Sequence, residues 1–450
     1  MRDLVCPLDF RYGREELKEV FGEKRRLQFL LDVEAALARA HAKVGNIPKE
    51  AAEEIKRKAS TRFVKLERVK EIEAETKHDI MAMVRALSEQ CEGDAGKYVH
   101  LGATSYDIVD TANALQFAVA TDFIQKGLKD LRQTLVDLAG KYKKTVMAGR
   151  THGQQTIPIT FGFKMAGFAM EVDRHIERLN DCRGRLLVGK LSGAVGTGAA
   201  LGEHALELQE IMLRELKLGV EDVSTQIVAR DRYNELVCVL GNIVTSLEKF
   251  ATEVRNLQRD EIGEVAEAFE AETQVGSSTM PHKRNPITSE QICGLARIVR
   301  GFMIPAFENA IQWHERDLCN SSGERFILPH SLILTDWIVF QMNRVFRNLR
   351  VFPDRMMENI EKSKGLTMAE SLMMRLVEKG LGRNEAHELM RRVSIKAVES
   401  KKSLKEVFME ENKKLNMLTA EEVDDALNPL SYLGVAEEIV DRVVRKLGRK

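Results

Sequence analysis

The chain has 450 residues, 44% of them apolar, which predicts two to four domains with a large core and excludes wholesale disorder. Its 68 basic side chains are balanced by 68 acidic ones, and this zero formal charge argues against a nucleic-acid partner, which would require a net basic surface. The sequence contains no apolar run of about 18 residues that could cross a membrane, and its first residues lack the apolar stretch of a secretory signal, so we expect a cytoplasmic protein without a membrane partner.

Long amphipathic helices are the elements that the sequence predicts along most of the chain. Apolar residues recur at steps of three and four between residues 24 and 44, which indicates a helix with one buried face. The same period runs through residues 108–142, 161–187, 232–269, 289–308 and 331–348. No proline interrupts the chain between Pro48 and Pro158 or between Pro158 and Pro281, which permits long helices. Strands are expected to be scarce, so the predicted fold class is all-α.

Two loop-rich passages divide these helices into three parts. They lie at residues 93–105 and 351–354, and they predict domains at residues 1–105, 106–354 and 355–450. Residues 189–202, rich in Gly and Ala, predict a further loop or a point of tight packing inside the second domain. A bundle of such long helices usually completes its apolar faces against copies of itself, so we expect a homo-oligomer.

The first candidate site is the loop at residues 276–286, where a glycine and two prolines exclude a continuous helix. Ser277 and Ser278 supply hydroxyls, Lys283 supplies a cation, and Asn285 supplies directed amide donors. This set suits a substrate that carries carboxylates. The alternative interpretation is a solvated connector between two helices.

The second and third candidates each contain a histidine. His152 lies in a polar cluster at residues 149–155 and is a candidate general acid or base, because an imidazole titrates near neutral pH. The alternative is a structural, hydrogen-bonded histidine. Lys77, His78 and Asp79 interrupt an otherwise helical stretch, and Asp79 is placed to orient an imidazole or a neighbouring cation.

The fourth candidate is the polar segment at residues 313–325. Ser321 and Arg325 are four residues apart and share one face if the segment is helical. Arg316, Arg325 and the hydroxyl form a plausible cradle for a monophosphate. The alternative is a surface lattice of ion pairs with Glu315 and Glu324.

The six cysteines are scattered, with no Cys-x-x-Cys pair. The sequence therefore predicts neither a zinc site nor a dithiol redox site. We expect reduced cysteines that serve as small core residues.

Taken together, these passages resemble the fumarase and aspartase superfamily, whose members eliminate fumarate, or reverse that step, without a metal or an organic cofactor. The most specific passage is Ser-Ser-Thr-Met-Pro-His-Lys-Arg-Asn-Pro at residues 277–286. The other passages follow in the same order over nearly the whole chain: Arg11-Tyr12, residues 77–79, Thr104-Ser105, residues 150–152, residues 224–226 and residues 314–325. Within the superfamily, the set is most similar to the adenylosuccinate lyase family.

The resemblance implies an all-α subunit of three domains, whose central long-helix bundle forms the twenty-helix core of a homotetramer. It also implies shared active sites, in which Ser277, His152 and the Lys283 region reach one pocket from three subunits. The implied substrates are nucleotides: fumarate leaves adenylosuccinate to give AMP, and leaves the succinylcarboxamide imidazole ribonucleotide (SAICAR) to give AICAR. No cofactor or metal is implied.

The resemblance assigns roles that suit β-elimination. Ser277 would remove a proton next to a carboxylate, and Lys283 and Asn285 would stabilise the resulting dianion. His152 would protonate the departing nitrogen, and Glu290 would hold that imidazole. The remaining implied residues are His78 near the carboxylates or phosphate, Thr104, Ser105 and Gln226 at the succinyl group, and Arg11, Tyr12, Arg316, Ser321 and Arg325 at the nucleotide, with Lys77, Asp79 and Ser278 beside them.

Four residues depart from the family pattern and leave the phosphate contacts less defined. Ala229 stands where a glutamine is common. Tyr106 stands where a small hydroxyl residue is usual, Asn320 where a histidine is familiar, and Gly323 where an alanine is familiar. Other eliminations of the superfamily remain alternatives, namely those of argininosuccinate lyases and carboxymuconate cycloisomerases, although the latter usually carry an aromatic residue at the position of His152. A non-enzymatic structural protein on the same scaffold is a remote alternative.

Overall fold

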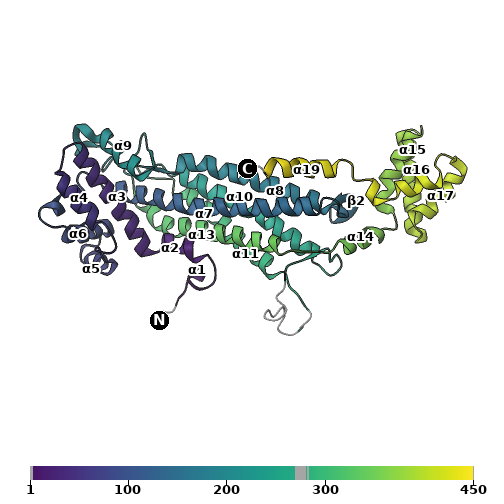
Figure 1. Cartoon of the computed structure of the whole chain (residues 1–450), viewed down its shortest axis with the longest axis horizontal. Helices are drawn as coiled ribbons and strands as arrows, with labels where there is room; N and C mark the ends of the chain where they lie inside the picture. Colours follow the sequence, from purple (N-terminus) through teal and green to yellow (C-terminus); the bar gives the residue numbers. More distant parts are fainter. Residues whose placement is uncertain (1–3, 269–279, 281–282, 449–450) are drawn as a thin grey trace. The chain divides into compact units, whose positions relative to one another are not determined.

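The computed structural model describes residues 4–268, 280 and 283–448. Helices make up most of this part of the chain, and its strands form only three two-stranded sheets (Figure 1). The all-α class is therefore confirmed. Each of the described helices is too short or too polar to span a bilayer.

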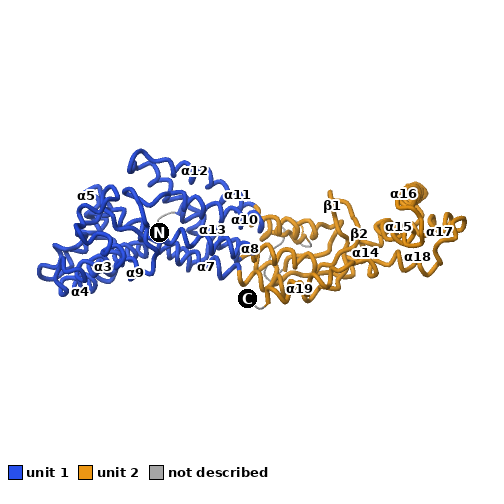
Figure 2. The backbone as a smooth tube through the Cα atoms, turned by 90° about the horizontal axis from the view of Figure 1, so that it is seen from above, with its two compact units in different colours: residues 1–128, 174–247, 294–340 blue, residues 129–173, 248–293, 341–450 orange. Residues whose placement is uncertain are grey.

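The chain divides into two compact units, each built from three separate stretches (Figure 2). Unit 1 comprises residues 1–128, 174–247 and 294–340, and unit 2 comprises residues 129–173, 248–293 and 341–450. Five helices contribute residues to both units: α7 (Ser105–Lys141), α8 (Phe161–Leu186), α10 (Asp231–Leu257), α11 (Ile287–Gly301) and α13 (Cys319–Arg347). The three-domain division at residues 105 and 354 stays a prediction.

The other elements of unit 1 are mainly helices of its N-terminal part. Helix α3 confirms the amphipathic stretch predicted at residues 24–44, and it packs against α4 and α9 with Leu27, Leu31 and Leu37 buried. Full burial of each such leucine stabilises the fold by about 1.5–3 kcal/mol. The remaining bounds are α1 (Pro7–Phe10), α2 (Glu15–Phe21), α3 (Glu23–Lys43), α4 (Lys49–Lys58), α5 (Leu66–Thr76), α6 (Asp79–Gln90), η1 (Ala95–Tyr98), β3 (Val188–Gly189), η2 (Ala199–His204), α9 (Ala205–Leu216), β4 (Gly219–Val220) and α12 (Met303–Glu308).

Unit 2 combines a hairpin, a short sheet and a cluster of short helices. Helix α14 packs against β1, and α15, α16 and α17 enclose a core that contains Leu372, Leu404 and Phe408. The bounds are β1 (Val146–Thr151), β2 (Gln154–Thr160), β5 (Val265–Ala266), β6 (Arg350–Val351), α14 (Pro353–Glu361), η3 (Leu366–Met368), α15 (Ala369–Glu378), α16 (Arg383–Ser400), α17 (Leu404–Leu415), α18 (Ala420–Ala426), η4 (Pro429–Ser431) and α19 (Ala436–Leu447).

Two predicted helices have different bounds in the structure. The helix predicted at residues 232–269 ends at Leu257. The chain then turns through Gly263, whose φ is +64°, and continues as β5. The stretch predicted at 289–308 is split into α11 and α12. The prediction for the cysteines is also wrong in part, since Cys182 and Cys293 are buried but Cys319 is exposed; all six are free.

Candidate active site

A cavity of about 600 Å³ lies in unit 1, within the range usual for small-molecule sites. Its wall is formed by the junction of α5 and α6, the start of α7, the loop before α10, and the start of α13. Nine predicted site residues line it: Lys77, His78, Asp79, Thr104, Ser105, Gln226, Arg316, Ser321 and Arg325. Segments far apart in the sequence thus meet at one site.

The junction of α5 and α6 presents His78 to the cavity. Lys77 ends α5 in a left-handed conformation, and His78 caps α6, where its Nδ1 accepts the Met81 backbone N–H at 3.3 Å. Because Nδ1 is an acceptor, the neutral imidazole carries its proton on Nε2, which can donate to an anionic ligand. Asp79 Oδ2 lies 3.3 Å from Arg325 Nη2, so Asp79 orients a cation at this wall.

The start of α7 supplies Thr104 and Ser105. The Thr104 N–H donates to Asp107 Oδ2 at 2.8 Å, and the buried Asp107 is itself paired with Lys190. Asp107 also accepts the backbone N–H of Ser192 at 2.9 Å. A helix N-terminus carries unpaired N–H groups and a partial positive charge, which favour a carboxylate. This position suits the predicted contact with a succinyl group.

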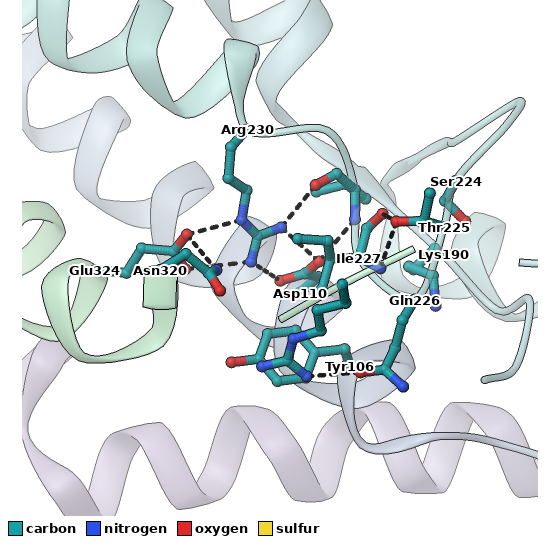
Figure 3. A network of polar contacts seen from close by, with 12 residues as sticks. Tyr106, Asp110, Lys190, Ser224, Thr225, Gln226, Ile227, Arg230, Asn320 and Glu324 are labelled. Atoms are coloured by element: carbon teal, nitrogen blue, oxygen red, sulfur yellow. Dashed lines mark hydrogen bonds and ion pairs between the residues drawn. The ribbon is translucent and has the colours of Figure 1, made fainter. Parts of the chain in front are cut away.

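A buried ion network links Asp110 of α7, Arg230 before α10 and Glu324 of α13, and Glu324 also lines the cavity (Figure 3). Arg230 donates to both oxygens of Asp110 at 2.8 and 2.9 Å, and to both oxygens of Glu324 at 2.8 and 3.2 Å. Burial lowers the pKa of Arg230, but Asp110, Tyr233 and Glu324 outweigh it and hold the pKa well above its usual value. The interpretation of Glu324 as part of a surface lattice is therefore wrong.

The two departures in α13 have structural reasons. Asn320 is fully buried, and its Nδ2 donates to Glu324 Oε1 at 2.7 Å, which extends the network. A Cβ atom at residue 323 would approach the side chain of Asn309 to 2.9 Å, so Gly323 allows the two segments to pack closely.

Arg316 lies over the ring of Tyr106, with Cζ 3.5 Å from the ring centroid. Its Nη1 donates to Gln226 Oε1 at 2.8 Å. Its Nε and Nη2 are buried and have no hydrogen-bond partner within the described part of the chain. Buried donors are normally paired, so these two nitrogens are available to a ligand. The Tyr106 hydroxyl also donates to Ser321 Oγ at 3.2 Å.

Arg26 is a cavity residue that the sequence analysis missed. It lies on α3, and its Nη1 donates to Asn113 Oδ1 at 3.1 Å and to Gln116 Oε1 at 3.2 Å. Burial lowers the pKa of Arg26, and the nearby charge of Arg325 lowers it further. In the sequence it occupies a polar position of an amphipathic helix, where solvent exposure is the usual expectation.

The other predicted catalytic residues belong to unit 2. His152 is exposed at the two-residue turn between β1 and β2, with φ of 54°, followed by Gly153 with φ of 75°. Positive φ at both positions is typical of a hairpin turn. In the sequence, Gly153 before a run that contains Thr and Ile is the feature that could have predicted this hairpin. Arg150 anchors β1 through hydrogen bonds of 2.9 and 2.5 Å to the buried Glu264.

The loop predicted to be catalytic, at residues 276–286, is described only in part. Lys283 is exposed and Asn285 is half-buried, while Glu290 is exposed in the first turn of α11. Ser277 and Ser278 lie outside the described residues. Arg11 and Tyr12 follow α1 in unit 1 and are not among the residues that line the cavity. Their roles stay predictions. In the described ranges, no cluster of three His, Cys, Asp or Glu side chains could hold a metal ion.

Comparison with known proteins gives matches along the chain. Residues 9–301 match the family model described as Lyase, and residues 365–443 match the model described as Adenylosuccinate lyase C-terminus. The adenylosuccinate lyase of Methanocaldococcus jannaschii is 48% identical over 446 residues, which cover 99% of this chain and 96% of the relative. The adenylosuccinate lyase of Pyrococcus horikoshii is 52% identical over 440 residues, which cover 98% of this chain and 97% of the relative.

Two solved structures have a similar fold. The crystal structure of a fumarate lyase from Mesorhizobium sp. BNC1 has a TM-score of 0.89 and 36% identity, covering 96% of this chain and 98% of that one. The 3-carboxy-cis,cis-muconate lactonizing enzyme from Pseudomonas putida has a TM-score of 0.89 and 35% identity, covering 98% of this chain and 99% of that one. The family matches and the near-complete coverage lead to one conclusion: this chain belongs to the adenylosuccinate lyase family.

Proposed function

We propose that this chain releases fumarate from adenylosuccinate to give AMP, and from SAICAR to give AICAR. The main support for the proposal is the cavity of unit 1, because predicted substrate-binding residues of this family line it. There, the start of α7 suits a carboxylate, and Arg316 leaves two buried nitrogens unpaired. His78 adds an Nε2–H donor at the same wall. These groups suit a substrate that carries carboxylates and a phosphate.

In the proposed reaction, Ser277 takes the proton from the carbon next to a succinyl carboxylate. Lys283 and Asn285 stabilise the negative charge that develops on that carboxylate. The electron pair then forms the double bond of fumarate while the carbon–nitrogen bond breaks. His152, held by Glu290, gives a proton to the departing nitrogen, which becomes the amino nitrogen of AMP or the carboxamide nitrogen of AICAR. The elimination needs no oxidant or reductant.

The proposal includes a cytoplasmic homotetramer with shared active sites. His152 and the Lys283 region would reach the cavity from neighbouring copies. Several large apolar side chains of unit 1 are exposed in the single chain, including Ile304 at 71%, Phe307 at 50% and Phe326 at 65%. Exposed apolar surface of this kind supports association with further copies.

Turnover of adenylosuccinate by the purified protein tests the reaction. We expect AMP and fumarate to appear without added metal, and no turnover of argininosuccinate or lactonisation of 3-carboxy-muconate. Turnover of either of these instead of adenylosuccinate would contradict the proposed substrate. Loss of activity after chelation, restored by a metal, would contradict the cofactor-free mechanism.

Subunit mixing tests the shared site. Ser277→Ala and His152→Asn should each lower the rate by about 10²- to 10⁴-fold. Asparagine tolerates the left-handed backbone of residue 152, so the hairpin should persist in the second variant. Mixed tetramers should regain activity because some sites would be intact. No recovery after proven subunit exchange would exclude a site that takes Ser277 and His152 from different copies.

A further inference from the structure

Tyr106 contacts two predicted nucleotide-binding residues at once. It is the second residue of α7 and lines the cavity. Arg316 lies over its ring at 3.5 Å from the centroid, and its hydroxyl donates to Ser321 Oγ at 3.2 Å. The attraction between a cation and an aromatic face reaches to about 6 Å, so the contact with Arg316 is a close one.

The ring face holds Arg316 without occupying its hydrogen-bond donors. One nitrogen, Nη1, is bonded to Gln226 Oε1, whereas Nε and Nη2 are buried and unpaired in the described chain. A carboxylate partner would have occupied these nitrogens as well as neutralising the charge. Stacking on Tyr106 leaves the edge of the guanidinium free for an anion, in a fixed orientation.

Ser321 receives its orientation from the same side chain. Because the Tyr106 hydroxyl donates to Ser321 Oγ, the serine hydroxyl keeps its own proton for another acceptor. One aromatic residue therefore directs a charged donor and a neutral donor. The ring is itself only half-buried at the cavity wall, which is not the position of a residue that serves the core alone.

We propose that Tyr106 is a positioning residue for the phosphate of the nucleotide, acting through Arg316 and Ser321. The proposal rests on the proposed function and names the residue that orients its phosphate contacts. Its effect is confined to ligands that carry the phosphate, since adenosine lacks the group that Arg316 and Ser321 would contact.

Inhibition by AMP and by adenosine measures this selectivity. Tyr106→Leu should weaken AMP about 2- to 30-fold through the lost ring face. Tyr106→Phe keeps the ring and should weaken AMP about 2- to 10-fold through the lost hydrogen bond. Adenosine inhibition should change less than about twofold in both variants. Tyr98→Leu, in η1 and away from the cavity, is the matched control and should change neither inhibitor.

A double-mutant cycle with Arg316→Gln separates positioning from a structural role. Arg316→Gln should weaken AMP strongly in the wild type and much less in the Tyr106→Leu background, because the arginine is no longer held there. Additive effects, or equal losses for AMP and adenosine, would overturn the proposal. If Tyr106→Leu does not fold, the cycle of Tyr106→Phe with Ser321→Ala supplies the same test. A wild type that does not cleave adenylosuccinate would instead refute the proposed function.

Discussion

Replacement of Arg230 by methionine removes the cation at the centre of the buried network while keeping an unbranched side chain. The Arg230 side chain is 1% exposed, and its Nη1 also donates to the Val228 carbonyl oxygen at 2.8 Å. Without the guanidinium, Asp110 retains the Val228 N–H at 2.9 Å, and Glu324 retains Asn320 Nδ2 at 2.7 Å. Two buried carboxylates would then remain with one donor each.

The expected loss of stability follows from these contacts. Removal of one partner from a buried ion pair costs about 3–5 kcal/mol, because the remaining charge is left uncompensated. One cation here serves two carboxylates, whose charges would also repel each other. We therefore expect Arg230→Met to lower the free energy of unfolding by about 5 kcal/mol, at the upper end of that range.

Urea and thermal denaturation at one fixed scan rate measure this loss. Arg185→Met is the matched control: Arg185 Nε donates to Glu235 at 2.8 Å, but the Arg185 side chain is 60% exposed, so the midpoints should hardly change. Adding Asp110→Asn and Glu324→Gln to Arg230→Met should restore much of the stability, since no buried charge would remain. An Arg230→Met protein as stable as the control would refute the reasoning.

Three further predictions concern stability. Burial lowers the pKa of His100, but the charge and the hydrogen bond of buried Glu34 outweigh this effect, so the net pKa of His100 is raised. The pair therefore stabilises the fold fully below about pH 6.5, and this stabilisation is lost as the pH rises through the raised pKa. The thermal midpoints of wild type and His100→Gln should thus differ more at pH 6 than at pH 9, and a pH-independent difference would contradict the assignment. Gly196→Ala should lower the thermal midpoint and raise KM, because the added Cβ would meet Ser224 O at 2.0 Å. Gly45→Ala is the control, because it has the same backbone strain without a clash. Equal effects of the two variants would show that the clash does not cause the loss. Phe250→Ala removes a fully buried ring that is stacked on Phe168, and it should lower the free energy of unfolding by about 3–5 kcal/mol. Urea unfolding measures this loss, and a much smaller loss would contradict the prediction.

The amino-acid sequence determined the helices and the chemical type of the site residues. The periods at residues 24–44, 108–142 and 161–187 match α3, α7 and α8 within three residues at each end, because a buried helical face needs apolar side chains at steps of three and four. The helix predicted at residues 232–269 extended too far, because apolar residues continue through residues 258–269 although the helix ends at Leu257 and the chain turns at Gly263. Apolar character alone does not distinguish a helix end from a short strand.

Only the tertiary structure decided which polar side chains meet. Arg230 lies 120 residues from Asp110 and 94 from Glu324, and Tyr106 lies 215 residues from Ser321. Spacing along one helix cannot report such pairs, because they depend on how separate helices pack. For the same reason the sequence did not identify Arg26 as a site residue, although packing of α3 places it at a cavity. Residue types and periods are local properties of the sequence, whereas the burial of a charge and the choice of its partner arise only when distant segments come together.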